Sequence, residues 1–155
     1  NSIAINKINE LKKRKTPLSI MLKSIDEITN YAIIKKTDFN IIEELLPGPF
    51  TILFESKPSN LSNLVQQSSN KIGIRIPNNK FCLDLLNQYT KPIITTSVNL
   101  HGQKALNNID EIQKRFFNID IYAGNINNKS KGSTILDFTE ENINIVRQGD
   151  GIYNI

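Results

Sequence analysis

The segment PGPFTILFES, residues 47–56, converts a helical pattern into a strand within a few residues. In the segment DFNIIEELL before it, the apolar residues recur at helical spacing, and Pro47 cannot continue a helix. Phe50, Ile52 and Phe54 then alternate along the chain, as they do when one face of a strand packs against a core. A helix that runs directly into a strand is typical of an α/β sheet, so this segment decides the fold class.

On both sides of this segment, strands alternate with helices early in the chain and dominate later. We expect helices at 2–13, 24–32, 38–46, 79–89 and 108–116, and strands at 17–23, 47–56, 71–77, 92–96, 119–124, 133–139 and 142–149. Ser2 is the expected N-cap of the first helix, and Ser24 with Glu27 has the spacing of a capping box. This order predicts an α/β fold with a twisted, open sheet of mixed strand direction and flanking helices.

Length and composition limit the class of protein. A chain of 155 residues fits one domain with a real core. Hydrophobic residues make up 39% of it and charged residues 22%, and no apolar run approaches the ~20 residues that span a bilayer. We therefore expect a protein that is neither disordered nor membrane-bound. No secretory signal or transit peptide is visible, so we expect a cytoplasmic location. The net charge of +4 favours an anionic partner without identifying it.

The single cysteine and the single histidine argue against a zinc site and against a catalytic triad. Cys82 cannot form an internal disulfide, and His101 is its only candidate partner for zinc or for a catalytic triad. Because Cys82 lies in an apolar helical pattern, we expect it to fill the core.

Ser97 and Asn99 follow the β-branched strand at 92–96, which we expect to be buried and central. Residues just past the carboxyl ends of strands line the ligand crevice of open α/β sheets. A hydroxyl and an amide two residues apart offer donors to phosphate or carboxylate oxygens. The alternative is a turn, ending at Gly102, that is closed by local side-chain hydrogen bonds. Spacing alone favours the turn.

Basic residues supply further candidates. The run from Lys12 to Lys15, which contains Arg14, either clamps a polyphosphate or compensates the dipole at the end of the first helix as a solvated charge. Arg75 lies between isoleucines in the strand at 71–77, where it either faces solvent or binds a carboxylate.

Two late segments complete the set of polar candidates. Ser133 follows Gly132, and Arg147 lies at a strand end before Gly149. Each segment alone is weak evidence for a binding site, because hydroxyls after glycine are common in turns. All the candidates together supply hydroxyls, an amide and guanidinium groups, with no triad and no metal cluster. They suit the binding and polarisation of an anionic substrate better than covalent catalysis.

Seven motifs in sequence order carry a resemblance to a known family. They are ELKKR, PLSI, LLPGPFTILFE, IGIRIP, PIITTSVNLHG, STILDFT and IVRQG, and they span nearly the entire chain. In this order they resemble the YrdC-type threonylcarbamoyl-AMP synthase family. The resemblance implies a YrdC-like twisted α/β sheet around a basic concave groove.

The resemblance also implies an enzyme, a nucleotidyltransferase that joins L-threonine, bicarbonate and ATP into threonylcarbamoyl-AMP and pyrophosphate. The product supplies the threonylcarbamoyl group for adenosine beside the tRNA anticodon. ATP would be a substrate and Mg²⁺ would accompany it, and tRNA and the tRNA threonylcarbamoyl-transferase proteins would be further partners. The chemistry needs no protein nucleophile, because the amine of threonine can attack bicarbonate or a carboxyphosphate-like species, and the resulting carbamate can attack the α-phosphate. The residues leave open whether bicarbonate is first phosphorylated or threonine is first carboxylated.

The motifs of the family fall on seven residues of this chain. Those expected at ATP are Lys12, Arg14, Ser97, Asn99, Ser133 and Arg147. Arg75 is expected to hold the carboxylate of threonine or of the intermediate.

This sequence departs from the family pattern at three places. The first strand of the family, with its PTeTvYGL motif, has no counterpart, because the chain enters a helix directly after Asn1. We therefore expect residues 1–155 to be a single YrdC-like domain without its first strand region. We expect this chain to fail to catalyse even if it binds nucleotide weakly. Thr16 replaces a common lysine, which leaves the role of Lys15 open. His101 stands where serine is frequent, and we expect no catalytic role for it.

Two other functions stay open at this point. A non-catalytic RNA-binding or ribosome-binding relative would use the same groove for backbone phosphates. A carbamoyl-transfer module would correspond to the similar domain of hydrogenase-maturation proteins, whose acylphosphatase and zinc-finger neighbours have no counterpart in this sequence.

Overall fold

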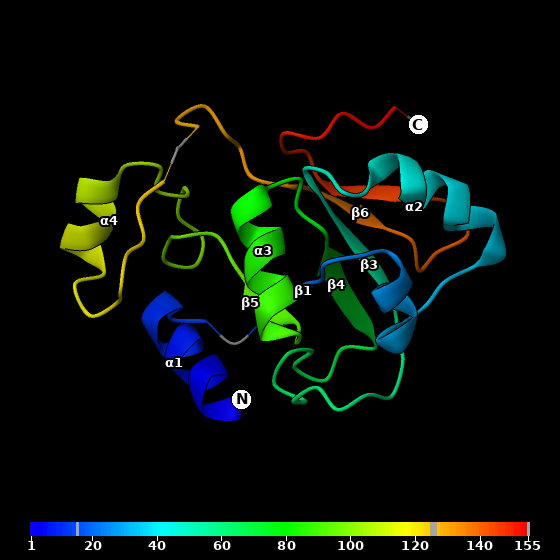
Figure 1. Cartoon of the computed structure of the whole chain (residues 1–155), viewed down its shortest axis with the longest axis horizontal. Coiled ribbons are helices and arrows are strands. Elements are labelled where there is room, and N and C mark those ends of the chain that lie inside the picture. The colour runs from blue at the N-terminus through cyan, green and yellow to red at the C-terminus, as the bar shows by residue number, and fades with distance from the viewer. Residues whose placement is uncertain (15, 125–126, 155) are drawn as a thin grey trace.

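The computed structural model describes residues 1–14, 16–124 and 127–154, and within them the strands form one mixed sheet (Figure 1). Its members are β1 (Ser19–Met21), β2 (Ala32–Ile33), β3 (Phe50–Ser56), β4 (Lys71–Arg75), β5 (Ile93–Thr95), β6 (Thr134–Asp137) and β7 (Asn144–Arg147). Their order is β5-β1-β4-β3-β6-β7, and β2 pairs with β3. The pairs β1–β4 and β3–β6 are parallel and the other pairs are antiparallel. The predicted α/β fold with an open mixed sheet is confirmed.

Helices precede or follow most of the strands. They are α1 (Ser2–Lys12), α2 (Phe39–Leu45), α3 (Lys80–Tyr89) and α4 (Ile109–Arg115), with short 3₁₀ helices η1 (Asp26–Asn30) and η2 (Lys36–Asp38). In the view of Figure 1, α2 and α3 are drawn over the sheet, and α4 lies away from it. None of these helices is long and apolar enough to cross a membrane.

The segment that decides the fold lies at the centre of the sheet. Ile52 of β3 pairs with Ile74 of β4, and Phe54 pairs with Ile72. These four side chains are at most 2% exposed. Burial of each of these side chains stabilises the fold by about 1.5–3 kcal/mol relative to exposure. This pair of strands therefore forms the centre of the hydrophobic core.

Two strand predictions are wrong. The β5 strand is the edge of the sheet in the described residues, not a central strand, and its residues are only half-buried. A β-branched run fits an edge strand as well as a central strand, because the burial of a strand depends on the neighbours that it acquires and not on its own sequence. Residues 119–124 are irregular rather than a strand, and Tyr122 among them is 85% exposed.

Three local predictions are also wrong. Asn1, not Ser2, caps α1, because its side chain accepts from the Ala4 amide at 3.1 Å. Ser24 caps no α-helix: η1 has no side-chain cap, and the Glu27 carboxylate accepts from the backbone amide of Lys23 instead. Cys82 is half-buried rather than part of the core. The fully buried side chain of α3 is Leu86, one turn further on.

Candidate functional site

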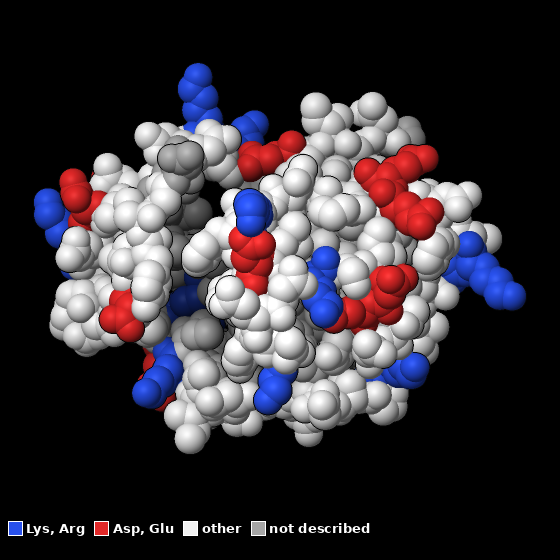
Figure 2. All heavy atoms as spheres, in the orientation of Figure 1, with Lys and Arg blue, Asp and Glu red and all other residues white. Residues whose placement is uncertain are grey.

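One face of the central strands packs against the core and the opposite face lines a cavity. Successive side chains of a strand point to opposite faces, so Thr51 and Leu53 point away from the core side of β3. They line a cavity of about 600 Å³ together with Gly73 and Arg75 of β4. Figure 2 shows the molecule hollowed between the α3 and α4 sides, with Lys or Arg side chains visible inside.

Six of the seven residues predicted from the sequence line this cavity. They are Arg14, Arg75, Ser97, Asn99, Ser133 and Arg147. The seventh, Lys12, lies behind the wall and contacts Ser97 and Asn99. Lys15 lies outside the described residues. The fold thus brings together residues that are up to 133 positions apart, from Arg14 to Arg147.

Lys12 connects the end of α1 to the segment from Ser97 to His101. It is 5% exposed, and its Nζ donates to Ser97 O at 2.5 Å, Asn99 O at 2.9 Å and Asn99 Oδ1 at 2.7 Å. The His101 amide donates in turn to Lys12 O at 3.0 Å. Burial and the nearby charge of Arg14 lower the pKa of Lys12 to about 8. Lys12 is therefore a buried cation with internal partners, not a solvated charge at a helix end.

Ser97 and Asn99 have features of both interpretations made from the sequence. The Ser97 hydroxyl donates to Asn99 Oδ1 at 2.7 Å, and Asn99 Nδ2 donates to Gln103 O at 2.6 Å. These are local hydrogen bonds of the kind that the turn interpretation requires. Both residues nevertheless line the cavity, so the turn forms part of its wall.

Arg75 lacks a partner for the buried nitrogen of its guanidinium group. Its Nε is buried and has no hydrogen-bond partner. No carboxylate of the described residues lies within ion-pair distance of it. Burial lowers the pKa of Arg75, the nearby Cys82 thiol counteracts this, and Arg147 lowers it further. Because a partly buried charge without an ion-pair partner is costly, this position favours an anion in the cavity.

Ser133 and Arg147 are joined on the opposite wall. Arg147 donates to Ser133 O through Nη2 at 2.5 Å and through Nε at 3.2 Å. The Ser133 hydroxyl lies 2.8 Å from Thr51 Oγ1, on the neighbouring strand. Thr51 was not predicted from the sequence, because the strand pattern marks it only as the residue between two core positions. Thr51 could be found only from the pairing of β3 with β6, which the sequence pattern does not reveal.

Arg14 lies where α1 has ended and the chain returns toward β1. Its Nη2 donates to Pro17 O at 2.7 Å and its Nε is buried without a partner. Burial lowers its pKa. Like Arg75, it is a guanidinium at the wall of the cavity whose buried Nε has no partner.

The side chains around the cavity are rich in positive charge. The cationic residues that line it are Arg14, Lys71, Arg75, Lys104, Lys131 and Arg147, and no Asp or Glu is among the described lining residues. Lys71 is paired with Asp137 at 2.8 Å, which leaves the other five without an acidic ion-pair partner in the described part of the chain. The same part of the chain contains no group of His, Cys, Asp and Glu suited to a metal ion.

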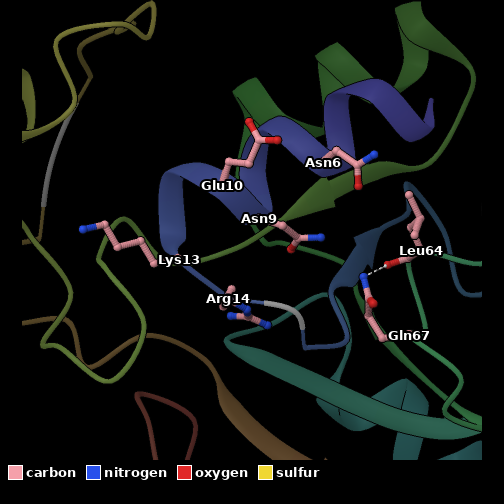
Figure 3. Close-up of a pocket in the computed structure, with 7 residues that line it drawn as sticks. All are labelled: Asn6, Asn9, Glu10, Lys13, Arg14, Leu64 and Gln67. Carbon is pink, nitrogen blue, oxygen red and sulfur yellow. Dashed lines mark hydrogen bonds between the residues drawn. The ribbon is translucent and has the colours of Figure 1, made fainter.

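A second hollow, of about 620 Å³, lies between α1 and the segment around Leu64 and Gln67 (Figure 3). Figure 3 shows Asn9 and Arg14 directed toward its interior. Asn9 Oδ1 and Arg14 Nε are both buried without partners, and one is an acceptor and the other a donor. The other predicted site residues that line a cavity line the first one, which is therefore the candidate site.

Residues 1–149 match the model of the Sua5_yciO_yrdC family, described as "Telomere recombination". A protein of Methanocaldococcus jannaschii named "Putative threonylcarbamoyl-AMP synthase" is 33% identical over 153 residues, which are 96% of this chain and 71% of that protein. The uncharacterized protein YciO of Escherichia coli K12 is 25% identical over 137 residues, which are 86% of this chain and 66% of YciO.

Solved structures share the fold. The crystal structure of E. coli YciO matches 97% of this chain with a TM-score of 0.86 at 23% identity, and the chain covers 75% of it. The structure of P. abyssi Sua5 complexed with L-threonine matches 96% of this chain with a TM-score of 0.85 at 22% identity. The chain spans 45% of that Sua5 chain, a little under half its length.

Proposed function

We propose a function from one premise, which is that this chain belongs to the Sua5, YciO and YrdC family. The proposed activity is that of an L-threonylcarbamoyladenylate synthase, which forms threonylcarbamoyl-AMP and pyrophosphate from L-threonine, bicarbonate and ATP. The observation that carries the proposal is Arg75, a guanidinium with a buried, unpartnered Nε in the same cavity as Ser97, Asn99, Ser133 and Arg147.

The charges of the cavity suit two anionic substrates at once. A guanidinium binds a carboxylate through two parallel hydrogen bonds, so Arg75 would hold the carboxylate of threonine. Arg14 and Arg147 lie at other parts of the wall, where they would face the triphosphate. The Sua5 relative that was crystallised with L-threonine supports the amino-acid half of this assignment.

The reaction balances without a covalent intermediate on the protein. The nitrogen of threonine forms a bond to the carbon of bicarbonate, and one oxygen of bicarbonate leaves as water. A carbamate oxygen then forms a bond to the α-phosphorus of ATP, and the bond from that phosphorus to pyrophosphate breaks. The protein orients the reactants and neutralises the charge of the departing pyrophosphate.

Mg²⁺ enters this proposal as part of the nucleotide substrate. The described residues that line the cavity include no carboxylate, and Mg²⁺ prefers carboxylate, phosphate and water oxygens. The triphosphate would therefore carry the ion, and the arginines would neutralise the charge that remains. The proposed partner that uses the product is the protein that transfers the threonylcarbamoyl group to tRNA.

Release of pyrophosphate by the intact protein tests the proposal. With L-threonine, bicarbonate and MgATP all present we expect steady release, and omission of either co-substrate should abolish it. Arg75→Gln should raise the KM for threonine at least tenfold, because one charge-assisted contact is worth about 1.5–3 kcal/mol. Lys7→Gln removes a positive charge from an exposed position on α1 outside the cavity and is the matched control.

Other outcomes would contradict the proposal. Pyrophosphate release at the same rate without threonine would exclude the synthase. Release only when carbamoyl phosphate replaces threonine and bicarbonate would identify a carbamoyl-transfer module. Tight RNA binding without any turnover would favour the non-catalytic alternative.

A further inference from the structure

We propose that Lys12 is a positioning residue: it fixes the direction of the hydrogen bonds around Asn99, so that Ser97 Oγ meets the bound substrate as an acceptor. The inference rests on the proposed function, because it assigns a role within the same nucleotide site. It differs from the expectation that Lys12 contacts the nucleotide and that Ser97 donates to its phosphates.

Lys12 has no proton left for a ligand. An ammonium group carries three protons, and three oxygens accept from Nζ, namely Ser97 O, Asn99 O and Asn99 Oδ1. The residue is 5% exposed and does not line the cavity. It therefore acts on a substrate only through the segment that it holds.

The side-chain amide of Asn99 has one permitted orientation. Lys12 Nζ can only donate, so the amide atom that faces it is the oxygen. Gln103 O can only accept, so the amide atom that faces it at 2.6 Å is the nitrogen. Both neighbours require the same orientation, and a flipped amide would lose both hydrogen bonds.

The orientation of Asn99 determines where the Ser97 proton points. Ser97 Oγ lies 2.7 Å from Asn99 Oδ1, and this oxygen has no proton to give. Ser97 must therefore donate to Asn99, which leaves only lone pairs of Oγ for the cavity that Ser97 lines. A phosphate oxygen, itself an acceptor, is unsuited to this position.

The substrate group at Ser97 is thus a hydrogen-bond donor. In a complex with MgATP the donors are the ribose hydroxyls, the adenine amine and water bound to the metal. The phosphates would be held elsewhere, by the guanidinium groups of the cavity. Lys12 governs this selectivity without contact to the substrate.

Calorimetric titration with two probes separates the roles. Tripolyphosphate supplies phosphate charge without a ribose or base, whereas ATP supplies donors as well. We expect Ser97→Ala to weaken ATP binding about tenfold and to leave tripolyphosphate binding within about twofold, and Ser97→Thr to restore ATP binding. Four further probes each lack one donor of MgATP: 2′-deoxy-ATP, 3′-deoxy-ATP, inosine triphosphate and ATP without Mg²⁺. The group that donates to Ser97 is the one missing from the probe whose affinity is the same for Ser97→Ala and the unmodified protein.

Lys12→Met should reduce the preference for ATP over tripolyphosphate about tenfold, because Asn99 is then free to turn. Lys13→Met removes an equal charge from the exposed next residue and should leave this preference unchanged. An equal loss of affinity for both probes in Ser97→Ala would overturn the inference, since Ser97 would then donate to phosphate. An unchanged preference in Lys12→Met would overturn the role of Lys12.

Failure of the proposed function has a different signature. If the unmodified protein binds neither probe, the nucleotide site itself is contradicted, and NMR of the ligand-free protein tests the hydrogen-bond direction. We then expect a slowly exchanging ammonium signal from Lys12. The Asn99 amide signal should shift in Lys12→Met and not in Lys13→Met. Absence of both effects would overturn the inference independently of any ligand.

Discussion

Two cations at the cavity, the buried Lys12 and the half-buried Arg75, differ in how their hydrogen-bond donors are satisfied. Lys12 donates to three oxygens of the protein, whereas the buried Nε of Arg75 has no partner. A cation with a complete set of partners supports structure, and a cation without one favours a ligand. This contrast separates the residue that shapes the site from the residue that binds in it.

The lowered pKa of Lys12 predicts a pH dependence of stability. Its pKa is about 8 in the folded protein, against 10.5 for an ordinary lysine. Between these values the unfolded chain binds more protons than the folded chain, so the contribution of Lys12 to the free energy of unfolding rises with pH. Arg14 is the charged neighbour that contributes to the shift, and the groups bonded to Nζ are uncharged oxygens.

Urea unfolding at pH 7 and pH 10 measures this contribution. The free energy of unfolding of the unmodified protein should rise between the two values relative to that of Lys12→Met, which cannot titrate. Lys13→Met should show the same change with pH as the unmodified protein. If the free energy of unfolding of Lys12→Met also changes with pH as that of the unmodified protein does, the pKa of Lys12 is not lowered by folding.

The candidate site residues were predictable to different degrees. Spacing alone left Ser97 and Asn99 as a turn, and the order of seven motifs was needed to assign them to a site. Their contacts with Lys12 could not be predicted, because they depend on how α1 packs beside a segment 85 residues later. Thr51 was missed for the same reason, since its place beside Ser133 follows from strand pairing.

At the scale of elements, two turns hold the far wall of the cavity together. The Asp150 amide donates to Gly132 O at 2.8 Å, and the Gly149 amide donates to Thr134 Oγ1 at 2.9 Å. A Cβ at Gly149 would overlap Gly132 O and the carbonyl group of Ser133. The close approach of these turns therefore requires glycine at 149.

Gly149→Ala should move the turn that carries Ser133 and weaken ATP binding. Overpacking of this kind costs about 1–3 kcal/mol, so the melting temperature should also fall. Gly124→Ala is the control, because no atom of the described residues lies within 4 Å of a Cβ at that position. Equal ATP affinity and equal melting temperatures for the two variants would mean that the turns are not coupled.

The sequence pattern predicted best the strands that pack one face of alternating apolar side chains against the core. The alternation in residues 47–56 and 71–77 survives in β3 and β4, because their core side chains pack in register. The alternation at 119–124 produces no strand, since no neighbouring strand pairs with it in the described structure. The same dependence on neighbours explains why the β5 strand is half-buried.

At the scale of the whole molecule, the cavity is formed by segments that strand pairing brings together from distant parts of the chain. The end of α1, strand β4, the segment after β5 and the β6–β7 pair each contribute one part of its wall. These parts adjoin one another through the pairings of β1 with β4 and β5 and of β3 with β6. Assembly of several substrates at one place is the property that such a cavity would serve.

Transfer of labelled carbon tests this property most directly. The intact protein would be given ¹³C-bicarbonate, L-threonine and MgATP, and the nucleotide products would be analysed by mass spectrometry. We predict threonylcarbamoyl-AMP that carries one ¹³C atom, formed in equal amount with pyrophosphate and absent when threonine is omitted. Hydrolysis of ATP without a ¹³C-labelled nucleotide product would contradict the claim that the cavity brings the three substrates together.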